Sequence, residues 1–79
     1  MTRDELLEKL MDLAAKRFKK ERATLNADDD FFDVLAIDSF QAMELMTDVE
    51  EEFEVEVPDY ELQGVKTFNS LASLIEKRL

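Results

Sequence analysis

One serine stands where a covalent group could be attached. Ser39 follows a loop rich in turn-forming residues and opens the apolar-periodic segment 39–53, which predicts a helix. We expect Ser39 to be the N-cap of this helix, with Ala42 at the third helical position and therefore no capping box. The helix dipole would favour a phosphate on the exposed hydroxyl by a few tenths to about 1 kcal/mol, whereas the adjacent Asp38 would repel it. The local chemistry permits a phosphorylated serine without requiring one.

The chain lacks the residues that most catalytic and metal sites need. Its 79 residues include no Cys and no His, which excludes disulfides, zinc–thiolate sites and imidazole acid–base catalysis. No nucleophile–base pair can be assembled, so a stand-alone enzyme is not expected. The loop contains three aspartates at a spacing that could indicate calcium ligands, Asp28, Asp30 and Asp33. An EF-hand loop starting at Asp28 would need Gly where Asp33 stands and Glu where Ser39 stands, so we predict no metal site.

The acidic residues are concentrated in the middle of the chain. There are twenty acids and ten bases, a net charge of −10, and residues 23–65 contain fourteen of the acids and no base. Such a segment repels nucleic acid and anionic lipid and is suited to basic protein surfaces. A charge run is also typical of a plain solvated face. An acidic helical interaction domain without a prosthetic group therefore remains an alternative.

The length of 79 residues predicts a single domain, residues 1–79. No apolar run approaches the roughly 20 residues of a membrane span. The start of the chain has acids, Asp4 and Glu5, where a signal peptide needs bases and then an apolar core. We expect a cytoplasmic monomer that does not insert into membranes.

The hydrophobic periodicity predicts helices with one long loop between the first two of them. Thr2 and Thr67 are expected to be the N-caps of the first and last helices, and Val55 or Val57 is expected to be buried by an extended connector. The predicted elements are a helix over 4–20, a loop over 23–38, a helix over 39–53, a connector over 53–57, a short helical turn over 60–63 ended by Gly64, and a helix over 68–78.

The helix over 39–53 has two apolar regions when its residues are placed at 100° intervals. Its core face is expected to consist of Ala42, Leu45, Met46, Val49 and Phe53. Its outer face is expected to present Phe40, Met43 and Thr47 beside Glu44, Asp48 and Glu51. Isolated exposed apolar residues are normal. A small apolar spot ringed by charge is also typical of a transient protein interface.

These residues resemble those of the acyl carrier protein family. The resemblance rests on Asp38-Ser39-Phe40, on the following Met43-Glu44-Leu45, and on the run from Glu50 to Asp59 that ends in Val-Pro-Asp. The upstream segment 31–35 and the pair Thr67-Phe68 are also similar to that family. The match extends from about Asp30 to Ile75, and the fixed spacing of its parts makes it specific.

The resemblance implies an all-α fold, a small four-helix bundle with a long first loop and a short third helix. It implies that Ser39 carries a 4′-phosphopantetheine arm from coenzyme A, whose thiol holds acyl groups as thioesters. The carrier would shuttle these groups between enzymes of fatty-acid, lipid or polyketide-type biosynthesis and would not itself be an enzyme. Its partners would be a phosphopantetheinyl transferase and acyl-loading and acyl-transfer enzymes with basic patches. These would dock on Asp38, Phe40, Met43, Glu44, Thr47, Asp48 and Glu51.

The sequence departs from the family pattern at four places. Phe40 stands where Leu is most common, and Ala36 stands where a Gly commonly precedes the serine, so the loop is expected to turn differently. Thr47 and Asp48 replace an apolar and a small residue on the partner-facing side. These departures favour a specialised carrier as much as a primary fatty-acid carrier. The run Asp38-Ser39-Phe40 and the stretch 60–62 also resemble those of D-alanyl carrier proteins, which remain an alternative.

Overall fold

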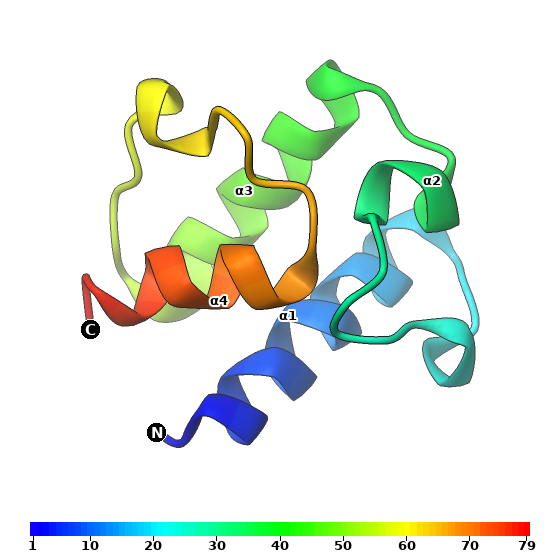
Figure 1. Ribbon diagram of the computed structural model, residues 1–79, viewed down its shortest axis with the longest axis horizontal. Coiled ribbons are helices and arrows are strands. Elements are labelled where there is room, and N and C mark those ends of the chain that lie inside the picture. Colours follow the sequence, from blue (N-terminus) through cyan, green and yellow to red (C-terminus); the bar gives the residue numbers. More distant parts are fainter.

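The computed structural model describes residues 1–79 and consists of helices and loops without a β-strand (Figure 1). Three longer helices form its body: α1 (Arg3–Phe18), α3 (Ser39–Phe53) and α4 (Phe68–Glu76). The connections contain the short helix α2 (Phe31–Leu35) and the 3₁₀ turns η1 (Arg22–Thr24) and η2 (Asp59–Leu62). The predicted all-α bundle is confirmed, with η2 at the position of its short third helix.

Helix α1 is the element against which both other long helices pack. Thr2 is its N-cap, as predicted, and forms a capping box with Glu5. Its buried stripe includes Leu6, Leu10 and Ala14, each at most 1% exposed. Facing them, α4 contributes a buried stripe that begins at Phe68 and follows the predicted N-cap Thr67. Burying these stripes between α1, α3 and α4 creates one continuous core.

The loop predicted between residues 23 and 38 is only partly irregular, because it contains α2. The Asp30 carboxylate accepts a hydrogen bond of 2.9 Å from the backbone N–H of Phe32 and so caps this helix. Phe31 is buried, and its backbone N–H donates to the Lys66 carbonyl oxygen at 2.8 Å. The aspartates of this segment predicted turns. An aspartate at a cap position can also start a helix, and Asp30 does so here because Phe31 and Leu35 are buried in the core.

The connector after α3 is extended and buries Val57, as predicted. The Glu50 carboxylate holds it, since its Oε2 accepts a hydrogen bond of 2.8 Å from the Val57 backbone N–H. Phe53, predicted as part of the core face, is only half-buried. It is the last residue of α3, and the chain turns away at Glu54, which has a left-handed backbone with φ 54°.

The acidic middle of the chain is partly neutralised by bases from its two ends. Sequence order suggested no local neutralisation between residues 23 and 65, but the fold brings Arg17 to Asp48 and Arg78 to Glu61. Lys9 lies 3.2 Å from Glu52, measured between Nζ and Oε2. Some acids of this segment are therefore paired in space, Glu44, Asp48, Glu52 and Glu61 among them, which a linear charge count cannot reveal.

Candidate functional site

The start of α3 is fixed by Asp38 and not by Ser39. The Asp38 Oδ1 accepts a hydrogen bond of 2.9 Å from the Gln41 backbone N–H, and the Gln41 Oε1 accepts one of 3.1 Å from the Asp38 backbone N–H. This reciprocal pair is a capping box, so the expectation of a Ser39 cap without a box was wrong. The spacing Asp-x-x-Gln was a readable signal for it.

Ser39 is consequently the first helical residue of α3, and its side chain is free of any capping role. The residue is exposed. The first backbone N–H groups of a 15-residue helix lie around it, at the positive end of the helix dipole. An exposed hydroxyl at this place is accessible for esterification, and a phosphate attached there would be electrostatically favoured.

The segment that leads into Ser39 makes a tight turn at Ala36. Ala36 has φ 54° and ψ 47°, a left-handed conformation that favours glycine. Its backbone N–H donates to the Asp33 carbonyl oxygen at 3.2 Å, and the Ile37 N–H donates to the Phe32 carbonyl oxygen at 3.1 Å. Ala36 therefore adopts a conformation that glycine takes more readily, and does so with some strain.

Ser39 also lies at the edge of an apolar cavity of about 210 Å³. The cavity lies between α2, α3, η2 and the first part of α4 and is open to solvent on one side, and nine of its twelve lining residues are hydrophobic. Its lining consists of Phe31, Phe32, Ser39, Ala42, Met43, Leu45, Met46, Asp59, Leu62, Gln63, Val65 and Leu71. An apolar cavity of roughly 150 Å³ is enough to bind benzene. This cavity is therefore large enough for a short apolar group attached near Ser39.

The outer face of α3 carries the exposed apolar residues that the sequence predicted. Phe40 is 73% exposed and Met43 is 47% exposed, and Met43 also lines the cavity. Thr47 and Glu51 are exposed as well, and the Thr47 hydroxyl donates to the Met43 carbonyl oxygen at 3.2 Å. Sequence reasoning missed Tyr60 of η2, which is 74% exposed. Exposed apolar residues therefore occur on η2 as well as on α3.

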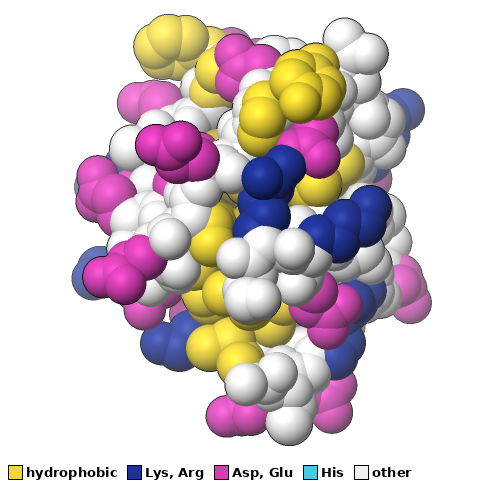
Figure 2. All heavy atoms as spheres, turned by 90° about the vertical axis from the view of Figure 1, so that its left-hand side faces the viewer, with side chains coloured by type: hydrophobic (Ala, Val, Ile, Leu, Met, Phe, Trp, Pro, Cys, Tyr) yellow, Lys and Arg dark blue, Asp and Glu magenta, His cyan; other side chains and the backbone are white.

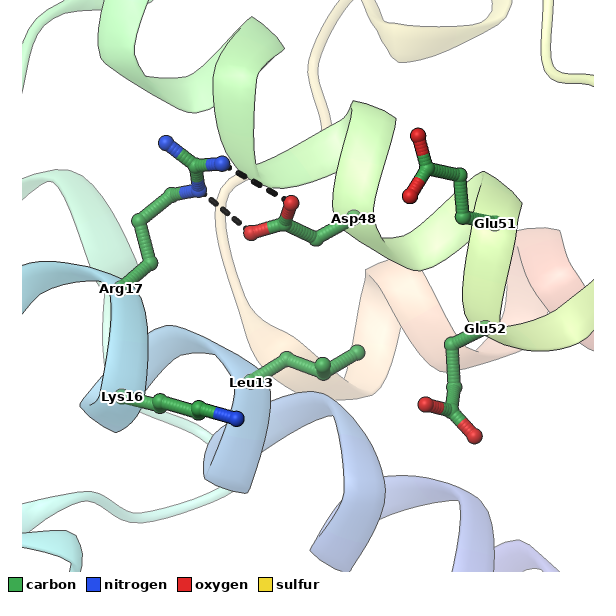
Figure 3. Close-up of a pocket in the computed structure, with 6 residues that line it drawn as sticks. All are labelled: Leu13, Lys16, Arg17, Asp48, Glu51 and Glu52. Carbon is green, nitrogen blue, oxygen red and sulfur yellow. Dashed lines mark hydrogen bonds and ion pairs between the residues drawn. The ribbon is translucent and has the colours of Figure 1, made fainter.

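Two of the predicted outer-face acids are not free. Figure 3 shows the Arg17 guanidinium of α1 pointing toward α3 and meeting the Asp48 carboxylate with two hydrogen bonds. One of these, from Nη2 to Oδ1, is 2.8 Å long, and the Arg17 Nη1 lies 3.8 Å from the Glu44 Oε2. Arg17, Asp48 and Glu51 also line the wider hollow of about 540 Å³ between α1 and α3, which lies away from Ser39 and is mostly lined by charged residues.

The ion pair perturbs both of its partners. Hydrogen bonding from Arg17 lowers the pKa of Asp48, and the same bond raises the pKa of Arg17. Asp48 is therefore ionised at neutral pH and engaged within the chain. The outer face thus has an apolar end near Ser39 and a charged end near Arg17.

Two further findings concern other kinds of site. No group of three or more Asp, Glu, His or Cys side chains is arranged to hold a metal ion, and Asp28 and Asp30 instead contact Asn69 and cap α2. None of the helices combines the length and apolar character that crossing a bilayer requires.

Comparison with known proteins gives a consistent result. The family model described as "Phosphopantetheine attachment site" matches residues 8–75. An acyl carrier protein of Exiguobacterium sibiricum is 32% identical over 79 residues, covering 100% of both chains, and one of Rickettsia typhi is 30% identical over 77 residues, covering 98% of this chain and 90% of the other. A solved structure of the acyl carrier protein from Enterococcus faecalis superposes with a TM-score of 0.78 at 26% identity, covering 100% of both chains.

Proposed function

Because the chain belongs to the acyl carrier protein family, we propose that Ser39 is the residue that bears its 4′-phosphopantetheine arm. The observation that carries this proposal is the position of an exposed serine at the first turn of α3 and at the edge of an apolar cavity. The other serines, Ser70 and Ser73, belong to α4, where Ser70 completes the cap with Thr67 and Ser73 accepts a hydrogen bond from Arg3. Neither lines the cavity.

A carrier of this family is a substrate for other enzymes and not an enzyme itself. The phosphopantetheine arm supplies the terminal thiol that holds an acyl group, which this chain without cysteine cannot supply. The chain's own residues would hold and orient the arm: the Asp38–Gln41 capping box fixes the first turn of α3, and the backbone N–H groups of that turn would favour a phosphate on Ser39.

The apolar cavity favours an acyl group over an aminoacyl group. Its lining is predominantly hydrophobic, and residues such as Leu45, Met46 and Leu71 would meet the methylenes of an acyl chain. The charged ammonium of a D-alanyl group would lose its hydration among these apolar side chains. Asp59 is the one carboxylate in the lining, and it is exposed to solvent, which weakens any pairing with the ammonium. The structure contains no observation that specifically favours the D-alanyl alternative.

The outer face of α3 is the proposed docking surface for partner enzymes. It comprises Asp38, Phe40, Met43, Glu44, Thr47, Asp48 and Glu51. Phe40 and Met43 supply apolar contact area close to the arm, and the carboxylates complement basic partners. On the side of the molecule shown in Figure 2, apolar side chains gather with acidic ones at the upper end, where Figure 1 places η2 and the start of α3.

The family implies a phosphopantetheinyl transferase and biosynthetic enzymes as partners. The finer proposal is that residues 1–79 act as one monomeric carrier domain in the cytoplasm. Its partners are then the transferase and the acyl-loading and acyl-transfer enzymes of fatty-acid, lipid or polyketide-type biosynthesis, each with a basic patch that faces α3.

Intact mass spectrometry after incubation with coenzyme A and a phosphopantetheinyl transferase tests the attachment site. The wild-type chain and Ser73→Ala, which removes an exposed serine elsewhere, should each gain the mass of one phosphopantetheinyl group. Ser39→Ala should gain none while remaining folded by circular dichroism. Loading of Ser39→Ala would overturn the assignment, as would a failure of the wild-type chain to load.

A further inference from the structure

The carboxylates of α3 are mostly engaged within the chain. Helix α3 carries five of them, and the basic residues of α1 contact three: Arg17 contacts Asp48 and Glu44, and Lys9 contacts Glu52. Glu50 accepts from the Val57 backbone N–H. Glu51 is the one α3 carboxylate without such a partner, and it is exposed. The acidic appearance of this helix in the sequence therefore overstates the negative charge that a partner meets.

The contact of Arg17 with Asp48 has the geometry of a strong ion pair. Its Nε and Nη2 donate to the two oxygens of one carboxylate, an arrangement that uses the planar fork of the guanidinium. About a third of the Arg17 side chain and 27% of the Asp48 side chain remain exposed. A cation from outside can therefore approach the pair, but it must compete with Arg17 for the carboxylate.

We infer that Arg17 is a specificity-determining residue of the docking surface. Because Arg17 forms an ion pair with Asp48 and lies next to Glu44, these two α3 carboxylates are less available to basic partner proteins. The inference rests on the proposed function of α3 as the docking face. A partner that displaces Arg17 gains both carboxylates. A partner that cannot displace it meets the rest of the docking surface, whose remaining carboxylates are those of Asp38 and Glu51. Arg17 thus selects for partners whose basic groups match this geometry and lowers the association rate of the rest.

The chain offers a closely matched control in Arg22. Its guanidinium also contacts two carboxylates, Glu8 at 2.8 Å and Asp12 at 3.1 Å, but both belong to α1. The Arg22 side chain is 31% exposed and that of Arg17 is 33% exposed. Arg17→Gln and Arg22→Gln therefore change the net charge equally and break the same number of ion pairs, and only Arg17→Gln releases carboxylates on α3.

The experiment measures the kcat/KM of a phosphopantetheinyl transferase for the wild type, Arg17→Gln, Arg22→Gln and the double variant Arg17→Gln/Asp48→Asn at low and high salt. Arg17→Gln should raise kcat/KM about 3- to 10-fold at low salt, because released carboxylates speed association, and the gain should fall at high salt. Arg22→Gln should change it less than about 2-fold, since the carboxylates that it releases belong to α1 and not to α3. Adding Asp48→Asn to Arg17→Gln should remove most of the gain.

Equal effects of Arg17→Gln and Arg22→Gln would overturn the inference, because net charge would then explain both. A slower reaction of Arg17→Gln would overturn it as well, because Arg17 would then help docking. Thermal melting accompanies each variant. If Arg17→Gln loses its fold, Arg17→Lys takes its place: it keeps the charge but loses the two-point contact, and the same ordering is expected. A chain that is never loaded contradicts the proposed function, whereas equal loading of all variants contradicts only the role of Arg17.

Discussion

The first two turns of α3 and its last two turns differ in what surrounds their side chains. At the first turns, Ser39 and Phe40 are exposed and Met43 borders an apolar cavity. At the last turns, the carboxylates of Asp48 and Glu52 contact bases of α1. The same helix therefore has one end free to meet other molecules and one end tied to the protein's own body.

This difference shows how a small domain can combine a site that is accessible to other molecules with a helix that is packed against the rest of the protein. The tied end anchors α3 on α1 through ion pairs and through Val49, which is fully buried. At the open end, the exposed side is shaped by the Asp38–Gln41 capping box and the turn at Ala36, while Leu45 and Met46 on the other side of the helix are buried in the core. Changes at the open end are therefore expected to affect loading more than stability, and changes on the core side of α3 the reverse.

The largest effect on stability is expected from the buried face of α3. Leu45 is 1% exposed, so Leu45→Ala should lower the free energy of unfolding by about 2–5 kcal/mol. Met43→Ala, two positions earlier and half exposed, should lower it by less than about 1 kcal/mol but slow loading by the transferase. Urea unfolding of both variants, beside transferase kinetics, makes the comparison. Similar losses of stability would mean that Met43 belongs to the core.

A smaller effect is expected from the cap of the open end. Asp38→Ala removes the acceptor of the capping box and should lower the free energy of unfolding by about 1 kcal/mol. Ser39→Ala leaves the box intact and should change it by less than about 0.5 kcal/mol. Urea denaturation of the two variants measures the difference. A larger loss for Ser39→Ala would show that the serine hydroxyl is the true cap.

The turn before Ser39 offers a change in the opposite direction. Ala36→Gly relieves a left-handed backbone and should raise the free energy of unfolding by roughly 0.5–1 kcal/mol, net of the greater freedom of glycine in the unfolded chain. Thermal melting detects this as a higher Tm. A Tm at or below that of the wild type would show that the Ala36 backbone is not strained in solution.

The smallest effect is expected from the pH dependence of the tied end. The folded-state pKa of Asp48 is lowered by Arg17, so its contribution is present above the unfolded value of about 3.9 and is lost as the pH falls through the folded value. The stability difference between wild type and Asp48→Asn should therefore shrink between pH 7 and about pH 3. Glu51→Gln, which breaks no ion pair, should show no comparable change. A difference for Asp48→Asn that stays constant with pH would argue against the ion pair.

The long helices were predictable because their signals are local. The stripe of α1, the Thr2 and Thr67 caps and the burial of Val57 all follow from periodicity and cap residues within a few positions. The sequence predicted that Ser39 is exposed but not which residue caps α3. Asp38 and Ser39 are both good cap residues, and only the capping box that Gln41 forms with Asp38 distinguishes them.

The remaining features depend on contacts between distant segments. Helix α2 needs the core that α4 provides for Phe31, whose ring centroid lies 5.7 Å from that of Phe68. The ion pair between Arg17 and Asp48 joins residues 31 positions apart, so no local sequence pattern predicts it. The cavity beside Ser39 likewise exists only once α2, α3 and η2 have been brought together.

The central claim is that Ser39 carries the arm and that the cavity beside it receives an apolar acyl chain. The most direct test compares amide chemical shifts of the ¹⁵N-labelled phosphopantetheinylated protein charged with octanoyl or with D-alanyl groups. We predict that octanoyl shifts the amides of cavity residues, Leu45, Met46, Leu62 and Leu71 among them, and that D-alanyl leaves them unchanged. Cavity amides that are unaffected by octanoyl, or shifted equally by both groups, would contradict the account.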